Sequence, residues 1–545
     1  MSLAKIILEK AKKIPAHFWI LAGIILIGIF LRTWHFQDWL IFNPDQARDI
    51  GIVSDVLKGK SSWIITGPEA GNTRVGLGPW FYHLEILAAK IFGNAPDKLA
   101  YPDLFFSILT IPLFYIFLKK YFPKNLSLAL AALYAVSYFA VKYSRFAWNP
   151  NSIPFFVLLF LLGMLMMAEN GRKRKYWGAV MAGIGIGVGI QLHVLLFFVL
   201  PTVAFLALFY LFIARHPLVP LAKMAGLMII FFLLANIGQI AYESKHNFGS
   251  IKKFVKVSLK TAKDDESSGG FSKNIFFQAQ ANFYVLTSLG EVKSGDFETV
   301  YNAFRRDPYF FYAPENKFYL AYLAIGSIFT LAGYILLVYF WRREREESKK
   351  NFLGLVGIYS FVTIAAMTPI VTEAELRYYI VLFFLPYIFL GLMLKPFWQV
   401  EKKWKIAFAL LICASVAALN LRSDAAEAKE HLSQKANSTK NAYFGETGEM
   451  AKYMMEKAGG SKVMYLQGSS NYFTRYYKPL GYFLKKEGYR LNRLPEEGWN
   501  PESNGPLFDV VRTNVARYRI GSQIRENKVK DMKVFGDVTL ILAGR

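Results

Sequence analysis

The residues with chemical potential begin in the stretch from Phe42 to Asp49, directly after the first long apolar run of the chain. Asn43 is a favourable helix N-cap, Pro44 suits the first helical position, and Gln46 stands where a capping box places Glu or Gln. These features predict a short helix that begins at the membrane surface. Asp45 then lies in its first turn.

Two further charges follow Asp45 at helical spacing. Arg48 and Asp49 come three and four residues later, so the three side chains share one helix face. Interaction with the helix dipole is the simple structural explanation of an acid in a first turn. A functional explanation depends on the other polar groups that the fold brings to the same place.

The composition indicates a membrane protein. The chain has 545 residues, of which 54% are hydrophobic, and its apolar runs alternate with short basic loops. Runs of about 17–24 apolar residues are typical of helices that cross a bilayer. The net charge of +25 sits largely in these loops, where the positive-inside rule expects it, so a nucleic-acid partner is not predicted. The single cysteine, Cys413, lies in an apolar run, which excludes a disulfide framework and a cysteine-based metal site.

Placing the basic loops in the cytoplasm predicts about eleven crossings, within a range of 11–13, with the N-terminus cytoplasmic. The predicted spans are 17–37, 101–118, 125–143, 153–169, 176–191, 194–213, 221–241, 318–341, 352–371, 377–394 and 406–421. Trp80 to Phe92 is predicted to be a helix in the outer interface, because counting it as a span would invert every later loop. We read the first run as a retained helix, since no small-residue cleavage site follows it.

The irregular parts of the chain then gather on the outer, extracytoplasmic side. We predict a transmembrane domain over residues 1–421, with outer loops 38–100 and 242–317, and a soluble α/β domain over 422–545. The loop 242–317 has aromatic flanks, including Phe276, Phe277 and Tyr284, which suit an interfacial helix or a lid. In the C-terminal domain the patterns predict helices over 449–457 and 472–486 and strands over 463–466 and 538–542. We expect this domain to serve as a scaffold or acceptor-docking module.

Several charged and aromatic side chains lie at the outer ends of the predicted spans. Each alone has a structural explanation: Arg145 and Arg377 could be interfacial arginines, and His193 a hydrogen-bonded structural residue. Together with Asp45, they are expected to form an anion site at one membrane face. Arginine binds phosphate through two parallel hydrogen bonds, so a lipid whose phosphate rests at the headgroup level would fit.

An ordered set of motifs resembles the GT-C superfamily of membrane glycosyltransferases, in the branch of protein O-mannosyltransferases and the lipid A aminoarabinose transferase. The resemblance covers about residues 15–400. The first motif is the acidic stretch from Phe42 to Asp49. The later ones are Gly78-Pro79-Trp80-Phe81-Tyr82 leading to Phe92-Gly93, Tyr143-Ser144-Arg145-Phe146-Ala147-Trp148-Asn149-Pro150, and Arg377-Tyr378-Tyr379 with Pro386.

The resemblance implies an inverting transferase that moves a hexose or pentose from a polyprenyl-phosphate donor to an acceptor hydroxyl on the extracytoplasmic face. Asp45 would be the general base, and cationic groups would stabilise the departing lipid phosphate. The residues expected near the donor phosphate are Arg48, Arg74, Arg145, Arg377 and Tyr378. Those expected in the acceptor and sugar pocket are Asp49, Tyr82, His83, Asn149, His193 and Glu375.

One position departs from the family pattern. Many relatives carry a second Asp before the proline of the arginine-containing motif, where this chain has Asn149. Because an amide cannot ionise, Asn149 is expected to orient the acceptor. A site with two carboxylates around an obligatory metal becomes less favourable. We therefore predict no cofactor and no metal, with a divalent ion possible but not expected.

Three other functions compete with this interpretation. A lipid-linked-sugar flippase or other transporter would use inverted repeats and broken helices at mid-membrane, and the glycine run from Gly183 to Gly189 could be such a break. An oligosaccharide ligase or polymerase would use a lipid-pyrophosphate donor. A silent scaffold would only present its outer domain. The acceptor could be a protein, a lipid or a cell-wall glycan, and the expected location is the plasma (inner) membrane.

Overall fold

The structure is a computed structural model that describes residues 15–64, 66–69, 76–169, 171–214, 217–249, 252–253, 270–290, 318–370, 376–398, 402–432, 441–493, 505–513 and 529–543. Of the predicted site residues, Arg74 and Glu375 lie outside these ranges. All others are within them.

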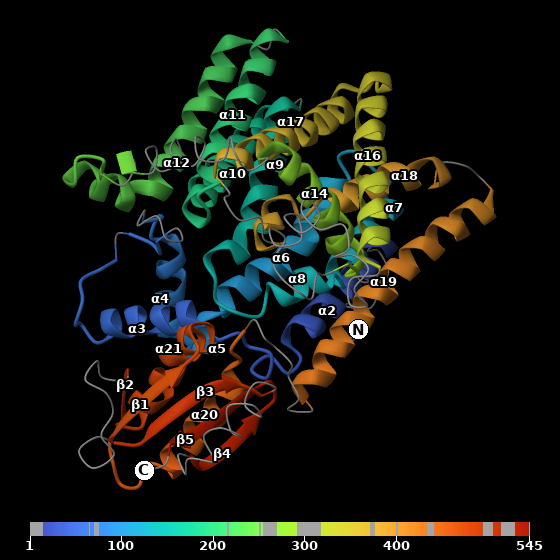
Figure 1. The fold of residues 1–545 in the computed structure, drawn as a ribbon. Coiled ribbons are helices and arrows are strands. Elements are labelled where there is room, and N and C mark those ends of the chain that lie inside the picture. Colours follow the sequence, from blue (N-terminus) through green and yellow to red (C-terminus); the bar gives the residue numbers. More distant parts are fainter. Residues whose placement is uncertain are drawn as a thin grey trace, which may run out of the picture.

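A bundle of helices makes up most of the molecule (Figure 1). Its long helices are α2 (Ala16–Thr33), α6 (Tyr101–Leu118), α7 (Lys124–Ala135), α9 (Ile153–Ala168), α10 (Arg172–Leu192), α11 (Leu196–Ile213), α12 (Leu218–Lys245), α14 (Gly270–Thr287), α16 (Tyr319–Arg343), α17 (Glu347–Ile370), α18 (Leu385–Trp398) and α19 (Lys403–Leu432). Shorter elements lie between them: α3 (Pro44–Leu57), α4 (Trp80–Phe92), α5 (Pro96–Leu99), α8 (Tyr138–Lys142), and the 3₁₀ segments η2 (Asn149–Ser152) and η5 (Leu376–Leu382).

The number of crossings can be compared with the eleven predicted. Within the described part of the chain, eight helices are long and apolar enough to cross a membrane, and the total is nine if η5 and α18, bent by 56°, are counted together as one span. The other two predicted spans fall on α7 with α8, which is interrupted at Val136–Ser137, and on α10, which starts with four basic residues. The chain is therefore a multi-pass, mostly helical membrane protein, as predicted.

The glycine run does not break the membrane helix. Residues 183–189 lie inside the continuous helix α10. A Cβ atom at Gly185 would lie 2.6 Å from the Phe160 backbone nitrogen, and one at Gly183 would lie 2.5 Å from the Met228 carbonyl oxygen. The glycines therefore allow α9 and α12 to approach α10 closely, which is the packing role that small residues have between membrane helices.

Helix α14 corrects the prediction for the 242–317 region. Its aromatic residues were expected in an interfacial helix or a lid, but Phe277 and Tyr284 are buried in the core of the bundle. Polar side chains on the same helix bond to its neighbours: Asn282 Nδ2 donates to Thr330 Oγ1 (2.9 Å) and Gln278 Nε2 to the Tyr334 hydroxyl (2.6 Å). These satisfied polar groups let a helix of mixed composition lie inside the bundle.

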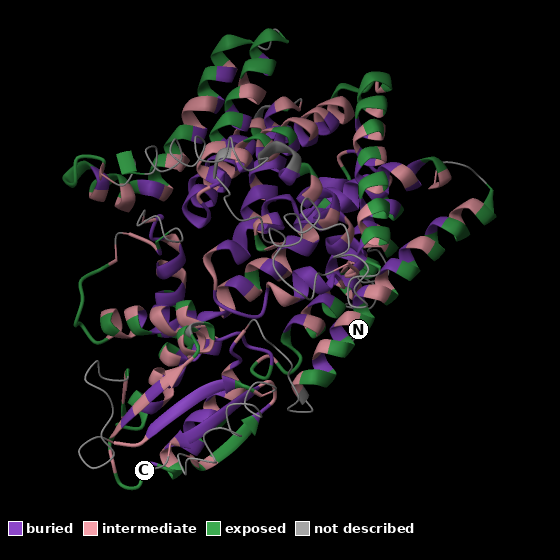
Figure 2. Cartoon of the chain, viewed as in Figure 1, coloured by how far each residue is buried: buried purple, intermediate pink, exposed green. Residues whose placement is uncertain are grey.

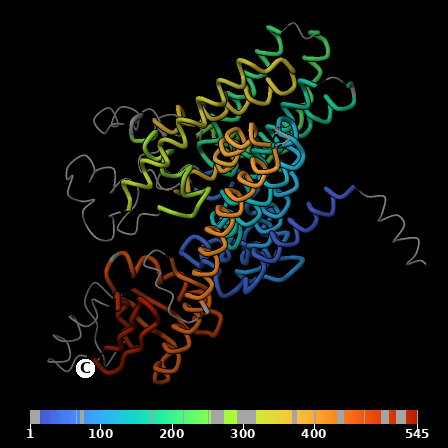
Figure 3. The backbone as a smooth tube through the Cα atoms, turned by 90° about the vertical axis from the view of Figure 1, so that its right-hand side faces the viewer, coloured from blue at the N-terminus to red at the C-terminus, as the bar shows by residue number. Residues whose placement is uncertain are grey.

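Helix α19 also extends further than predicted, from Lys403 through the expected end at 421 to Leu432. The residues after 421, from Arg422 to Leu432, are mostly good helix formers and contain no Gly or Pro to stop the helix. In Figure 3 this helix leads from the bundle toward the C-terminal domain.

In its described residues, the C-terminal domain has a five-stranded sheet and two helices. Its elements are α20 (Phe444–Glu456), β1 (Val463–Gly468), α21 (Ser470–Lys486), β2 (Arg490–Arg493), β3 (Leu507–Arg512), β4 (Val529–Phe535) and β5 (Val538–Ala543). The strand order is β2-β1-β3-β5-β4; β1 runs parallel to β2 and β3, and β5 antiparallel to β3 and β4. Strands β3 and β5 are almost wholly buried (Figure 2), and all four predicted elements are present.

Candidate active site

Helix α3 begins where the capping signals predicted. Pro44 is its first residue, and the Gln46 side chain accepts a hydrogen bond from the Asn43 backbone nitrogen at 3.0 Å. The Gln46 amide also donates to the Ala147 carbonyl oxygen at 2.8 Å. This bond fixes the first turn of α3 to Ala147, in the loop before η2. Asn149, the first residue of η2, comes two residues after Ala147.

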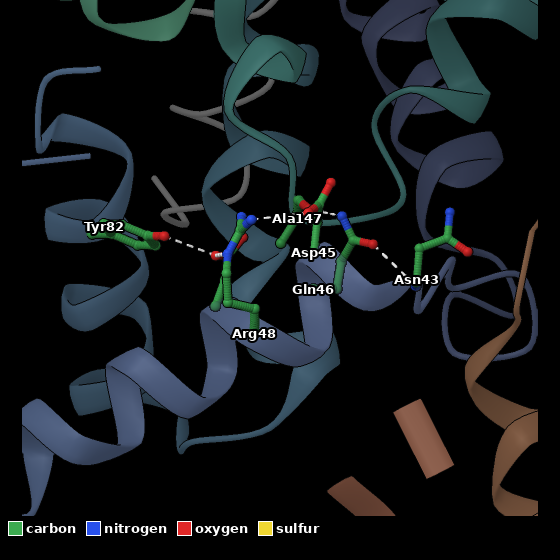
Figure 4. A network of polar contacts seen from close by, with 7 residues as sticks. Asn43, Asp45, Gln46, Arg48, Tyr82 and Ala147 are labelled. Atoms are coloured by element: carbon green, nitrogen blue, oxygen red, sulfur yellow. Dashed lines mark hydrogen bonds and ion pairs between the residues drawn. The ribbon is translucent and has the colours of Figure 1, made fainter. Parts of the chain in front are cut away.

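Arg48 is the centre of a charge network on α3. Its Nη1 lies 2.9 Å from Asp45 Oδ1 and its Nε lies 2.8 Å from Asp49 Oδ1. The Tyr82 hydroxyl, on α4, donates to the same Asp49 oxygen at 2.8 Å. Figure 4 shows the Tyr82 hydroxyl directed from α4 toward the side chains beside Arg48. The predicted grouping of Asp45, Arg48 and Asp49 on one face is confirmed.

The two carboxylates of this network have opposite environments. The Asp45 side chain is 60% exposed, whereas the Asp49 side chain is 4% exposed. Burial raises the pKa of Asp49, although Arg48 and the Tyr82 hydroxyl act in the other direction. Burial also raises the pKa of Tyr82, with the Asp49 charge as the next cause. Asp45 is thus the carboxylate with free access, and Asp49 anchors the guanidinium beside it.

A second buried acid lies behind Asp49. Glu85, one turn after Tyr82 on α4, is 1% exposed, and neither carboxylate oxygen has a hydrogen-bond partner within the described ranges. Burial raises its pKa well above the ordinary value, and the charges of Asp49 and Asp103 add to the shift. Burial without a partner therefore favours the neutral form of this carboxyl group. Glu85 is not among the residues predicted for the site.

Asp103, also buried, was missed altogether. It accepts hydrogen bonds from the Trp148 backbone nitrogen (3.0 Å) and the Ser152 hydroxyl (2.5 Å), so it holds both ends of the segment that contains Asn149. An acid in the first turn of an apolar helix is costly to bury without partners. That rule was the signal that could have identified Asp103.

Arg145 has a different setting from the one expected. It is 2% exposed; Nη1 donates to the Leu31 carbonyl oxygen (2.9 Å) and Nη2 to the Trp34 carbonyl oxygen (2.7 Å). Its guanidinium lies over the Trp39 ring, 4.4 Å from the centroid. Burial lowers the pKa of Arg145 to about 10, so the group remains charged at neutral pH. Arg145 therefore binds the C-terminal carbonyls of α2, the favourable position for a cation on a helix.

A second polar group lies where α10, η2 and η5 meet. Asn149 Nδ2 donates to the Leu192 carbonyl oxygen (2.6 Å), and the neighbouring His193 ring packs edge-on against Tyr378 at 5.7 Å. Burial lowers the pKa of His193 to about 4, with the Arg377 charge as a further cause. His193 is therefore neutral at physiological pH. Arg377 itself is exposed, with its guanidinium 5.3 Å from the Tyr378 ring centroid.

Helix α4 connects the two polar groups. At its start, the Trp80 backbone nitrogen donates to Gln191 Oε1 (3.3 Å), two residues before His193. Further along, His83 Nε2 lies 2.8 Å from the Ile64 carbonyl oxygen, and its ring packs on Trp63. His83 thus fixes the loop after α3.

No metal-binding arrangement is evident in the described residues, where no cluster of three or more His, Cys, Asp or Glu side chains could hold an ion. Metal independence stays a prediction. Chemically, the site offers an accessible carboxylate in contact with the half-buried Arg48 guanidinium, together with further polar side chains and the exposed Arg377.

A family model described as dolichyl-phosphate-mannose-protein mannosyltransferase matches residues 77–238. This stretch contains α4, Asn149 and His193. No curated protein matches the chain by sequence.

Solved structures of ArnT from Cupriavidus metallidurans match nearly the whole chain at 12% identity. The apo structure has a TM-score of 0.51 and covers 96% of this chain and 97% of its own. The structure bound to undecaprenyl phosphate has a TM-score of 0.50, with 97% and 98% covered. The Pmt1-Pmt2 complex of S. cerevisiae, bound to its sugar donor, matches 44% of this chain and 34% of its own at 15% identity and a TM-score of 0.34. The family model thus covers residues 77–238, whereas the similarity to the ArnT fold extends over nearly the whole chain. The chain has the fold of the membrane glycosyltransferase ArnT, and part of it resembles the protein mannosyltransferase family.

Proposed function

We propose that the protein transfers a sugar, with inversion, from a polyprenyl-phosphate donor to an acceptor hydroxyl on the extracytoplasmic face of the plasma membrane. The description of the matching family names a lipid-phosphate sugar donor, and the ArnT fold has been solved with undecaprenyl phosphate bound. The basic loops favour a cytoplasmic N-terminus and an extracytoplasmic C-terminal domain.

The observation that carries the proposal is the contrast between Asp45 and Asp49. Both contact Arg48, but only the Asp45 carboxylate is open to an incoming hydroxyl. In the proposed step the acceptor oxygen attacks the anomeric carbon of the sugar, and its proton passes to Asp45. The bond between that carbon and the phosphate oxygen breaks. The electron pair leaves with the polyprenyl phosphate.

Cations at the same face would stabilise the leaving phosphate as its charge develops. We assign this role to Arg48, whose side chain is 34% exposed, and to the exposed Arg377, which has Tyr378 beside it. We assign Arg145 instead to holding the end of α2, because both its Nη atoms already donate to backbone carbonyls. The donor-phosphate role of Arg74 is retained from its position in the sequence.

The acceptor and sugar pocket is proposed to include polar groups of α4 and of the junction between α10 and η2. Asn149 and His193 meet at the end of α10, while Tyr82 and His83 belong to α4. Glu375 is kept in this set from its sequence position alone. Hydroxyl, amide and imidazole groups can donate and accept hydrogen bonds, so they suit the recognition of sugar and acceptor hydroxyls. The reacting charges are assigned to Asp45 and the arginines.

The experiment incubates purified protein in lipid nanodiscs with polyprenyl-phosphate hexoses, polyprenyl-phosphate pentoses and a lipid-pyrophosphate oligosaccharide. The readout is release of free polyprenyl phosphate. The proposal expects consumption of a monophosphate donor and identifies the sugar class by which one is used. Consumption of the pyrophosphate donor alone, or flipping of an intact lipid-linked sugar in liposomes without release, would overturn it.

A further inference from the structure

The C-terminal domain meets the transmembrane domain at the residues just before α3. Ile41 and Tyr443 form an antiparallel β-bridge. The Phe42 backbone nitrogen donates to the Ala442 carbonyl oxygen (2.8 Å), and the Phe444 nitrogen donates to the Leu40 carbonyl oxygen (2.9 Å). Segments about 400 residues apart in the chain are therefore paired as two short strands.

Asn43, the N-cap of α3, adds a side-chain link to this pairing. Its Oδ1 accepts a hydrogen bond from the Ala442 backbone nitrogen at 2.8 Å, and its Nδ2 donates to Asn441 Oδ1 at 3.0 Å. One amide group thus uses both its acceptor and its donor on the C-terminal domain. The residue two positions later is Asp45.

Aromatic packing surrounds the same point. Phe42 is fully buried, and its ring lies 5.6 Å from that of Phe444, 5.2 Å from that of Tyr482 and 5.9 Å from that of Phe483. Tyr482 and Phe483 belong to α21, which packs along α3 (Figure 1). Aromatic contacts of this kind add to the hydrophobic burial and prefer defined ring geometries.

These contacts fix the position and direction of the first turn of α3 from the side of the C-terminal domain. We propose that the segment Asn441–Phe444 is a clamp that positions Asp45 for the reaction, with Asn43 and Asn441 as positioning residues. The inference rests on the proposed function, because Asp45 is the group being positioned. It gives the C-terminal domain a part in catalysis, instead of a role restricted to docking an acceptor.

The clamp acts through geometry. Asp45 is exposed, and within the described residues its side chain has one recorded ion pair, with Arg48 of the same helix. The direction of its carboxylate therefore depends on where the first turn begins. A loss of positioning lowers the rate of the bound complex more than the affinity for substrate, because a misplacement of about 1 Å is costly for reacting groups.

The test compares four forms of the full-length protein: wild type, Asn441→Ala, Asn441→Asp and Asn492→Ala. Asn441→Ala removes the acceptor for Asn43 Nδ2 without altering the helix cap itself. Asn441→Asp retains an oxygen at that place. Asn492 lies in β2, where it pairs with Tyr465 of β1, and it is the matched control for loss of an asparagine side chain from the same domain. The first readout is the kcat and KM of donor consumption, and the second is hydrogen–deuterium exchange of the α3 amides.

The clamp predicts that Asn441→Ala lowers kcat about fivefold, the effect of one hydrogen bond, with KM within about twofold of wild type. Exchange in α3 should be faster in this variant. Asn441→Asp should recover most of the rate, and Asn492→Ala should match wild type in both readouts. Unchanged kcat and α3 exchange in Asn441→Ala would overturn the clamp. So would an equal loss in Asn492→Ala.

The exchange arm separates this inference from the proposed function. If wild type consumes no donor, the proposed function has failed. Faster α3 exchange in Asn441→Ala would then still support the structural clamp, and unchanged exchange would refute it as well.

Discussion

Replacement of Arg48 by methionine tests whether Arg48 compensates the charge of the buried Asp49. Arg48→Met removes the cation that faces Asp49, whose side chain is 4% exposed, and leaves Tyr82 as its remaining hydrogen-bond donor among the described contacts. Breaking a buried ion pair costs about 3–5 kcal/mol because one charge stays uncompensated. Arg48 is 34% exposed, so solvent screening reduces this to about 2 kcal/mol.

The cost should depend on pH with a defined sign. Burial already raises the pKa of Asp49, and loss of Arg48 raises it further. When the pKa of a carboxyl group is higher in the folded than in the unfolded protein, its contribution to stability is fully present at pH values below the pKa of the unfolded state. This contribution is lost as the pH rises through the pKa of the folded state. Arg48→Met should therefore be close to wild type in stability at pH 5 and clearly less stable at pH 8.

The assay is the apparent melting temperature in nanodiscs at both pH values. Arg345→Met, at an exposed arginine in the loop between α16 and α17, serves as the control. The double variant Arg48→Met/Asp49→Asn should regain the stability lost at pH 8, because a neutral amide needs no counter-ion. If the double variant is as unstable as Arg48→Met at pH 8, then the buried Asp49 charge is not what Arg48 compensates, and the reasoning is refuted.

Three other predictions follow from the described residues. Burial raises the pKa of Glu446 to about 7, and its carboxyl group accepts a hydrogen bond from the Tyr476 hydroxyl (2.9 Å). The stability of the C-terminal domain should therefore fall by up to ~3 kcal/mol as the pH rises from about 4.5 to 7. Glu446→Gln should abolish this pH dependence in exchange measurements on α20. His193 Nδ1 accepts a hydrogen bond from the Leu195 backbone nitrogen (3.1 Å), so His193→Asn, which retains an acceptor, should keep near-normal stability and an unchanged pH profile of activity. His193→Leu should lose about 1 kcal/mol of stability in thermal unfolding. An altered pH profile of activity in His193→Asn would contradict the neutral state of His193. Donor consumption should be unaffected by excess EDTA, and a loss that added divalent metal restores would refute metal independence.

The sequence predicted those features that depend on local chemistry. The start of α3 follows from a proline, a cap and a capping glutamine within four residues, and the shared face of Asp45, Arg48 and Asp49 follows from helical spacing. The membrane helices and the strands of the C-terminal domain follow from long apolar runs and short β-rich ones. These signals do not require knowledge of what lies opposite.

The features that were missed or misplaced depend on partners far away in the chain. In the sequence Arg145 resembles a phosphate ligand, but in the structure it donates to the carbonyl oxygens of Leu31 and Trp34 at the end of α2. Asp103 gains its role from a segment about 45 residues later. In the same way, α14 is a buried helix because its neighbours provide partners for its amides, and no local pattern reports those partners.

The central claim is that Asp45 accepts the acceptor proton. It is tested most directly by the rate of donor consumption in Asp45→Asn beside Asp55→Asn, which makes the same change at an exposed acid on the same helix. The account predicts a loss of at least about 100-fold for Asp45→Asn, the contribution of a positioned general base, and a wild-type rate for Asp55→Asn. A rate for Asp45→Asn within a few-fold of wild type would contradict it.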